Sequence, residues 1–181
     1  MSADVSVSPA LSPRGDDRDI VSEAWSALAT VPDPEVPVVS IVELGIVRAV
    51  RADGDAVVVV LTPTYSGCPA TEAIEAMVRA ALRERRIDAR VQYALAPAWT
   101  TDWIAPEARA RLRAFGIAPP GTSARVDVSG ISPLRRARID VACPRCGSRD
   151  TALVSQFGST ACKAQYRCKA CAEPFDYFKP H

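Results

Sequence analysis

Residues 143–171 read C-P-R-C-G-S-R-D-T-A-L-V-S-Q-F-G-S-T-A-C-K-A-Q-Y-R-C-K-A-C, with C-x-x-C pairs at Cys143/Cys146 and at Cys168/Cys171. Each pair can direct two thiolates at one cation, and two pairs at this spacing can complete a tetrahedral site of the zinc-ribbon kind. A module of about 40 residues buries too little surface to fold without such a metal. We therefore expect a zinc ribbon at 138–181, with structural Zn²⁺ favoured over iron.

Two details of this stretch qualify the expectation. Gly147 follows the first pair and suits a turn that aims backbone N–H groups at sulfur, whereas Ala172 is less typical in that place. If 161–168 is a strand, Cys162 and Cys168 lie on the order of 20 Å apart and cannot share one metal. Cys162 is then a small buried side chain or an interface thiol that faces the preceding domain.

The rest of the chain has the composition of a globular protein, with 48% apolar and 24% charged residues among 181. Residues 1–15 are rich in serine and proline, lack the features of a signal peptide, and predict a disordered leader. The longest apolar run, 56–61, is far short of the roughly 20 residues that cross a bilayer. Cysteines in a chain with no export signal favour a reducing, cytoplasmic location.

Residues 16–116 predict an α+β domain, in which helices pack on a small mixed sheet. Residues 117–137 have turn chemistry and predict a linker or extended arm. The proline-rich stretch 31–38 predicts a stiff loop from which Asp33 and Glu35 project, or else a plain connector. The expected elements are helices at 16–30, 69–86 and 106–115 and strands at 46–50, 57–62 and 90–95. The first two strands should form a hairpin, and the second of them should be central in the sheet. Trp99 and Trp103 are expected to cover the core as lids.

Cys68 stands apart from the other cysteines, in the stretch L-T-P-T-Y-S-G-C-P at 61–69. Pro69 suits the first helical turn, so we expect Cys68 at the helix N-cap or beside it, where the helix dipole favours a thiolate. The sole histidine is His181, so a thiol enzyme is disfavoured, and Cys68 is either a ligand for a soft metal or cluster or merely a cap. Hydroxyl groups support this loop: Thr62, Thr64 and Ser66.

Charge and missing motifs exclude other classes of function. Neither G-x-x-x-x-G-K-[ST] nor G-x-G-x-x-G occurs, so a nucleotide-driven enzyme is not expected. Residues 135–181 carry 9 Lys/Arg against 4 Asp/Glu. Four thiolates around Zn²⁺ carry a formal charge of about −2, which this excess can offset. We favour that interpretation over a nucleic-acid-binding ribbon.

Several motifs resemble known families. D-P-E-V-P at 33–37, S-I-V-E-L-G-I-V at 40–47 and L-T-P-T-Y-S-G-C-P at 61–69 resemble the small domain shared by cytosolic iron-sulfur assembly factors and bacterial SufT. The ribbon stretch F-G-S-T-A-C-K-A-x-Y-R-C-x-A-C at 157–171 is similar to the PaaD-like accessory proteins of phenylacetyl-CoA epoxidase. The resemblance covers about residues 18–180.

This resemblance implies a maturation factor that is not itself an enzyme. It would help to assemble the iron or iron-sulfur centres of a multicomponent diiron epoxidase by contact with the oxygenase or reductase subunits, without nucleic-acid or membrane partners. Cys68 matches the family's cysteine in T-x-x-x-C-P at 64–69, and Asp33 and Glu35 match its acidic loop. One thiol is too few for a cluster, so a homodimer is one option. The alternative is a scaffold that grips the epoxidase through its ribbon.

Overall fold

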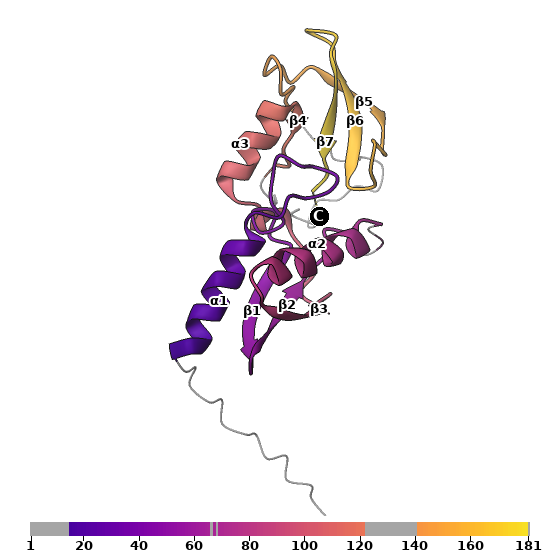
Figure 1. The fold of residues 1–181 in the computed structure, drawn as a ribbon. Helices are drawn as coiled ribbons and strands as arrows, with labels where there is room; N and C mark the ends of the chain where they lie inside the picture. The colour runs from indigo at the N-terminus through magenta and orange to yellow at the C-terminus, as the bar shows by residue number, and fades with distance from the viewer. Residues whose placement is uncertain (1–14, 66, 68, 122–140, 181) are drawn as a thin grey trace, which may run out of the picture.

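The computed structural model describes residues 15–65, 67, 69–121 and 141–180 (Figure 1). In chain order the elements are α1 (Gly15–Leu28), β1 (Val47–Asp53), β2 (Ala56–Leu61), α2 (Thr71–Glu84), β3 (Asp88–Tyr93), the short 3-10 helix η1 (Thr101–Trp103), α3 (Pro106–Phe115), β4 (Ile117–Ala118), β5 (Thr151–Ser155), β6 (Lys163–Cys168) and β7 (Pro174–Phe178). The elements form two sheets with helices beside them.

The N-terminal domain is built on a three-stranded sheet with β2 in the centre, as its apolar sequence predicts. β1 and β2 pair antiparallel across a two-residue turn, where Gly54 has a φ of +63° that favours glycine. β2 and β3 pair in parallel because α2 returns the chain to the same end of the sheet. This mixed sheet, with α1 and α2 packed on it, confirms the α+β class (Figure 1).

The start of α2 differs from the expectation. The helix begins at Thr71 with Ala70 as its N-cap, and Ala70 already has helical angles of φ −76° and ψ −5°. Pro69 therefore lies in the turn before the helix and not in its first turn, and Cys68 precedes the N-cap by two positions in the sequence. A proline marks a helix start only to within a residue or two, because its fixed φ suits the preceding turn equally well.

The second sheet joins the two halves of the chain. Its strand order is β4-β7-β6-β5, with β4 parallel to β7 and the other pairs antiparallel. β4 follows α3 directly, across the left-handed Gly116 (φ +99°), and comes from the stretch expected to be a linker or extended arm. At the start of the expected ribbon, residues 138–140 lie outside the described residues, and residues 141 and 142 are not in a strand.

The ribbon docks on the N-terminal domain through one end of its sheet. Tyr166, Phe175 and Tyr177 form the ribbon's own aromatic core. Cys162 and Phe178, in contrast, belong to the hydrophobic core of the N-terminal domain. The ring of Phe178 lies 6.1 Å from that of Trp99, and Trp99 Nε1 donates a hydrogen bond to the Leu44 carbonyl at 2.9 Å. The two modules therefore share a core.

Candidate functional site

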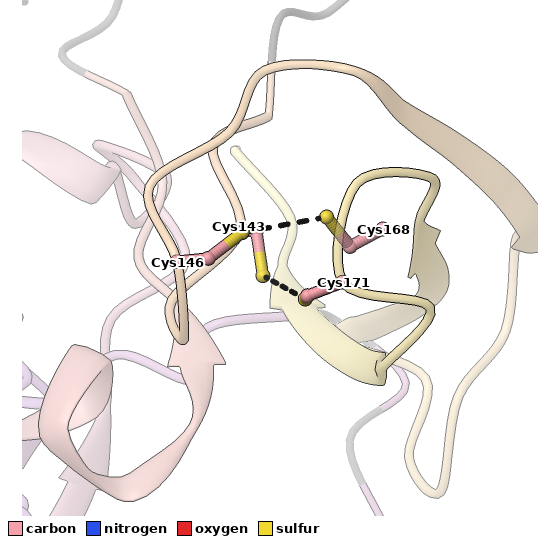
Figure 2. Close-up of side chains that lie close together, drawn as sticks. All are labelled: Cys143, Cys146, Cys168 and Cys171. Carbon is pink, nitrogen blue, oxygen red and sulfur yellow. Dashed lines mark hydrogen bonds between the residues drawn. The ribbon is translucent and has the colours of Figure 1, made fainter.

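The four-cysteine site lies between two turns of the ribbon (Figure 2). Cys143–Cys146 precedes β5, and Cys168–Cys171 connects β6 to β7. Gly147 follows the first turn with a φ of +76° and donates its backbone N–H to the Cys143 carbonyl at 2.9 Å. Ala172 has the equivalent place in the second turn, with a φ of +63°. Both turns therefore require a left-handed residue after their second cysteine, and in the second turn an alanine bears that strain.

We expect Ala172→Gly to stabilise the ribbon by about 0.5–1 kcal/mol, because a left-handed alanine costs more than a glycine and part of that gain is offset by chain entropy. The measurement is the urea midpoint of the metal-loaded protein. Gly147→Ala is the matched control and should lower the midpoint by a similar amount, since its added Cβ meets nothing within 4 Å and only the backbone is strained. A lower midpoint for Ala172→Gly would contradict this assignment.

The sulfur atoms of the two turns converge. All four lie within 4.8 Å of one another, with Cys143 Sγ 3.8 Å from Cys171 Sγ and Cys146 Sγ 3.6 Å from Cys168 Sγ (Figure 2). Four sulfurs at about 2.3 Å from one tetrahedral ion lie about 3.8 Å apart, so these separations fit a single metal. None of these cysteines is in a disulfide. Among the described residues no other such group of three or more ligands occurs.

The protonation of these thiols also fits a cation. The backbone N–H of Cys171 lowers the pKa of Cys168 to about 7. For Cys171, the backbone N–H of Glu173 lowers the pKa, but desolvation and the three neighbouring cysteines raise it by more, to about 12. Cys171 would therefore have to give up its proton to bind a cation, whose charge would stabilise the thiolate. The donor set fits a structural metal with no open position.

The acidic loop differs from the expectation at Asp33. Its side chain does not project from the loop but is 93% buried, and Asp33 Oδ1 accepts hydrogen bonds from the backbone N–H of Glu35 at 2.9 Å and of Val36 at 2.8 Å. Desolvation raises the pKa of this carboxyl. An aspartate readily caps backbone groups two or three residues ahead, which the proline pattern alone does not reveal. Asp33 thus shapes the loop, and Glu35 is the partly exposed carboxylate.

Cys162 meets this loop from the ribbon. Its side chain is buried, its Sγ donates to Glu35 Oε2 at 3.6 Å, and it lies 3.1 Å from Thr160 Oγ1. Burial raises the pKa of this thiol to about 11, so it carries its proton at neutral pH. The sequence predicts Cys162 either as a small buried side chain or as an interface thiol. The structure shows features of both, because the side chain is buried and faces the first domain.

The loop after β2 lies beside Cys162 as well. A cavity of about 20 Å³, large enough for one water molecule, is lined by Pro63 and Thr64 together with Glu35 and Cys162. On its other side the same loop lines an open pocket of about 350 Å³ with Trp99. Thr62, at the start of the loop, is buried, and its N–H donates to the Ile46 carbonyl at 2.8 Å. The predicted site residues Ser66 and Cys68 lie outside the described residues.

Lys163 is a site residue that the sequence patterns do not reveal. Its side chain is 6% exposed next to Cys162, with Nζ 3.8 Å from Asp176 Oδ2 and 3.5 Å from the Glu35 carbonyl oxygen. A buried ammonium needs such partners to avoid a large desolvation penalty. The only signal in the sequence is its position beside Cys162, because the partners come from distant segments.

Comparison with known proteins gives matches to both modules. The family described as PaaD zinc beta ribbon domain matches residues 130–179, and the family described as iron-sulfur cluster assembly protein matches residues 22–92. A relative from Escherichia coli (strain K12), named as a 1,2-phenylacetyl-CoA epoxidase subunit, is 50% identical over 160 residues, which cover 88% of this chain and 92% of that protein.

Two solved structures are similar to about half of this chain. A domain of unknown function, DUF59, from Bacillus anthracis is 28% identical with a TM-score of 0.50, and the match covers 54% of this chain and 94% of that chain. A conserved hypothetical protein from Thermotoga maritima is 26% identical with a TM-score of 0.44, over 50% of this chain and 91% of that one.

The fold and the four-cysteine site define a protein in which a DUF59-type iron-sulfur assembly domain is joined to a zinc ribbon. The Escherichia coli relative is identical at half of the aligned positions, and the alignment covers 92% of its length. The chain belongs to the PaaD family of phenylacetyl-CoA epoxidase subunits. In the part of the chain that the structure describes, no helix is both long and apolar enough to span a membrane.

Proposed function

We propose that this chain is an accessory factor, and not a catalyst, that delivers iron or an iron-sulfur cluster to a multicomponent diiron phenylacetyl-CoA epoxidase during its maturation. The family match to an iron-sulfur assembly domain and the name of the Escherichia coli relative support this proposal. Its partners would be the oxygenase or reductase subunits. Because one cysteine is too few to hold a cluster, the cargo would be held between the Cys68 thiols of two copies or passed directly to the partner.

The observation that carries the proposal is the contact between the ribbon and the acidic loop. Cys162, Glu35 and Thr64 line one small cavity, and Thr64 begins the T-x-x-x-C-P segment that carries Cys68. A ribbon that served only as a tether would not need to place a thiol and a buried lysine against this loop. The contact supports a role in which the ribbon holds the loop region in one arrangement.

The two cysteines outside the ribbon metal site would then have different roles. Cys162 is a buried, protonated thiol, and such thiols bind metal poorly because the thiolate is the ligand. Its S–H donates to Glu35, so Cys162 acts as a positioning residue for that carboxylate. Cys68 remains the candidate ligand for the cargo, with Glu35 and the hydroxyls of Thr62, Thr64 and Ser66 as supporting groups.

For the ribbon, we propose that the resident metal is Zn²⁺, held by Cys143, Cys146, Cys168 and Cys171. The separations of their sulfur atoms suit a tetrahedral ion, and a closed four-thiolate site is typical of structural zinc. Zinc bound there would hold the two turns of the ribbon together. It would supply no catalysis, since every coordination position is filled by the protein.

The test is complementation of a strain that lacks the gene, followed by measurement of iron and iron-sulfur content in the purified epoxidase components. We expect Cys68→Ser to lower that content about tenfold or more, as expected for loss of a ligand. Cys162→Ala should retain most of it and destabilise the protein by about 1 kcal/mol, the usual cost of one buried hydrogen bond.

The pair of variants separates this proposal from a passive scaffold. Both remove one thiol outside the ribbon metal site, so a general loss of sulfur chemistry would affect them alike. If Cys68→Ser matures the epoxidase as well as the wild type, delivery through Cys68 is wrong. A scaffold that grips the epoxidase through the ribbon would then be the better account, provided that ribbon variants still lose partner binding.

A further inference from the structure

A basic groove lies between α3 and the first C-x-x-C turn of the ribbon, away from Glu35 and Cys162. It has a volume of about 710 Å³. Three arginines and three prolines make up most of its lining, together with two alanines of α3: Arg109, Arg113, Pro119, Pro120, Pro144, Arg145, Ala110 and Ala114. The groove thus draws its cations from both modules.

Within the described part of the chain, Arg109 alone of these arginines makes hydrogen bonds that hold the fold. Arg109 donates to the Pro120 carbonyl at 2.7 Å and to the Thr101 carbonyl, and so fixes the chain where it leaves α3. Arg113 and Arg145 are exposed and have no hydrogen-bond or ion-pair partner among the described residues. Arg113 lies in the last turn of α3 and the Arg145 guanidinium lies beside Gly116, which ends that helix, a position that is favourable to cations. Two unpaired guanidinium groups in one groove are suited to a carboxylate-bearing ligand.

The stretch of sequence that follows this groove is not acidic. The segment that follows Gly121 in the sequence, residues 122–140, carries four arginines and two aspartates, so it adds positive charge. The net charge of the whole chain is +1, which gives a second copy no general attraction to this surface. An acidic segment of a different protein is the occupant that the charges favour.

We propose that this groove docks an extended acidic segment of an epoxidase subunit, with carboxylates on Arg113 and Arg145 and the intervening chain against the proline walls. Proline-lined walls suit an extended chain because they present apolar surface without competing N–H donors. The identity of the partner rests on the proposed function, whereas the acidic chemistry rests on the groove alone. Because α3 and the ribbon both contribute, the partner would recognise the docked arrangement of the two modules.

The test is calorimetric titration of the full chain, with its ribbon metal, into the purified oxygenase and reductase components at several salt concentrations. Arg113→Glu/Arg145→Glu should weaken binding at least about tenfold and flatten the dependence of log Kd on log salt. Arg113→Gln/Arg145→Gln should lie between this variant and the wild type. Equal metal content and equal unfolding midpoints show that the variants remain folded.

Arg18→Glu/Arg51→Glu is the matched control, because it makes the same change in net charge at two exposed arginines, one in α1 and one in β1, that do not line the groove. It should bind like the wild type. Unchanged affinity of the Arg113/Arg145 variants overturns the proposal, as does an effect confined to self-association or wild-type protein that binds neither component. If Cys68→Ser does not impair maturation, the proposed function is wrong, but the proposal that the groove binds an acidic segment is unaffected.

Discussion

Cys143→Ser should lose the metal and unfold the ribbon. Replacing one of four thiolates opens the site and removes much of a binding free energy of about 10–16 kcal/mol, which for a structural zinc site is also folding free energy. Cys143 and Cys168 are both buried in the ribbon's own core, so the aromatic cluster around Tyr166 should lose its order with them. The measurements are the metal content per chain, by elemental analysis, and the circular dichroism of the ribbon's strands.

Cys162→Ser is the control for this result. It makes the same chemical change in the same module, at a cysteine outside the four-sulfur group. It should therefore keep one equivalent of metal. Retention of one equivalent by Cys143→Ser would show that the four-cysteine assignment is wrong, and iron in place of zinc in the wild type would correct the identity of the metal. Cys168→Ser, from the second turn, should behave as Cys143→Ser does.

Residue patterns within short stretches of the sequence correctly predicted a helix and a hairpin. The expected helix at 106–115 matches α3 at both ends, because Pro106 is favourable at the first helical position and Gly116 supplies the left-handed residue that ends the helix. The turn residues between two strand-like runs likewise predicted the hairpin of β1 and β2, and the continuous apolar run of the second strand predicted the central position of β2. The ends of α3 and the hairpin depend on neighbours within a few residues, whereas β2 is central because it also pairs with the more distant β3.

Contacts between distant segments could not be predicted in the same way. Cys162 and Glu35 are 127 residues apart in the sequence, so no spacing rule indicates that they meet. The sequence leaves Cys162 between a buried side chain and an interface thiol, because both follow from the same apolar position on a strand. Asp33 is a different case, because its carboxylate accepts hydrogen bonds from Glu35 and Val36 in its own loop, a local contact that the proline pattern alone does not reveal.

Phe178→Ala should be the most damaging single truncation at the junction of the modules. Phe178 is 1% exposed, is among the largest fully buried side chains of the described residues, and lies in β7 of the ribbon sheet while packing in the N-terminal core. Truncation of a buried phenylalanine costs about 3–5 kcal/mol, which for a chain of this length lowers Tm by about 6–20 °C. Trp99 is one of three tryptophans in the chain and contacts this ring, so its part of the indole fluorescence reports on the junction.

The same variant tests whether the two modules unfold as one unit. In the wild type, the shared core predicts that the change in tryptophan fluorescence and the release of the ribbon metal occur at one midpoint. In Phe178→Ala the two signals should separate, because the four-cysteine site can hold the ribbon after the junction has opened. Phe115→Ala, at a ring that is 55% exposed on α3, is the control and should change stability by no more than about 0.5 kcal/mol. Coincident midpoints in Phe178→Ala would show that Lys163, Cys162 and β4 hold the modules together without this ring.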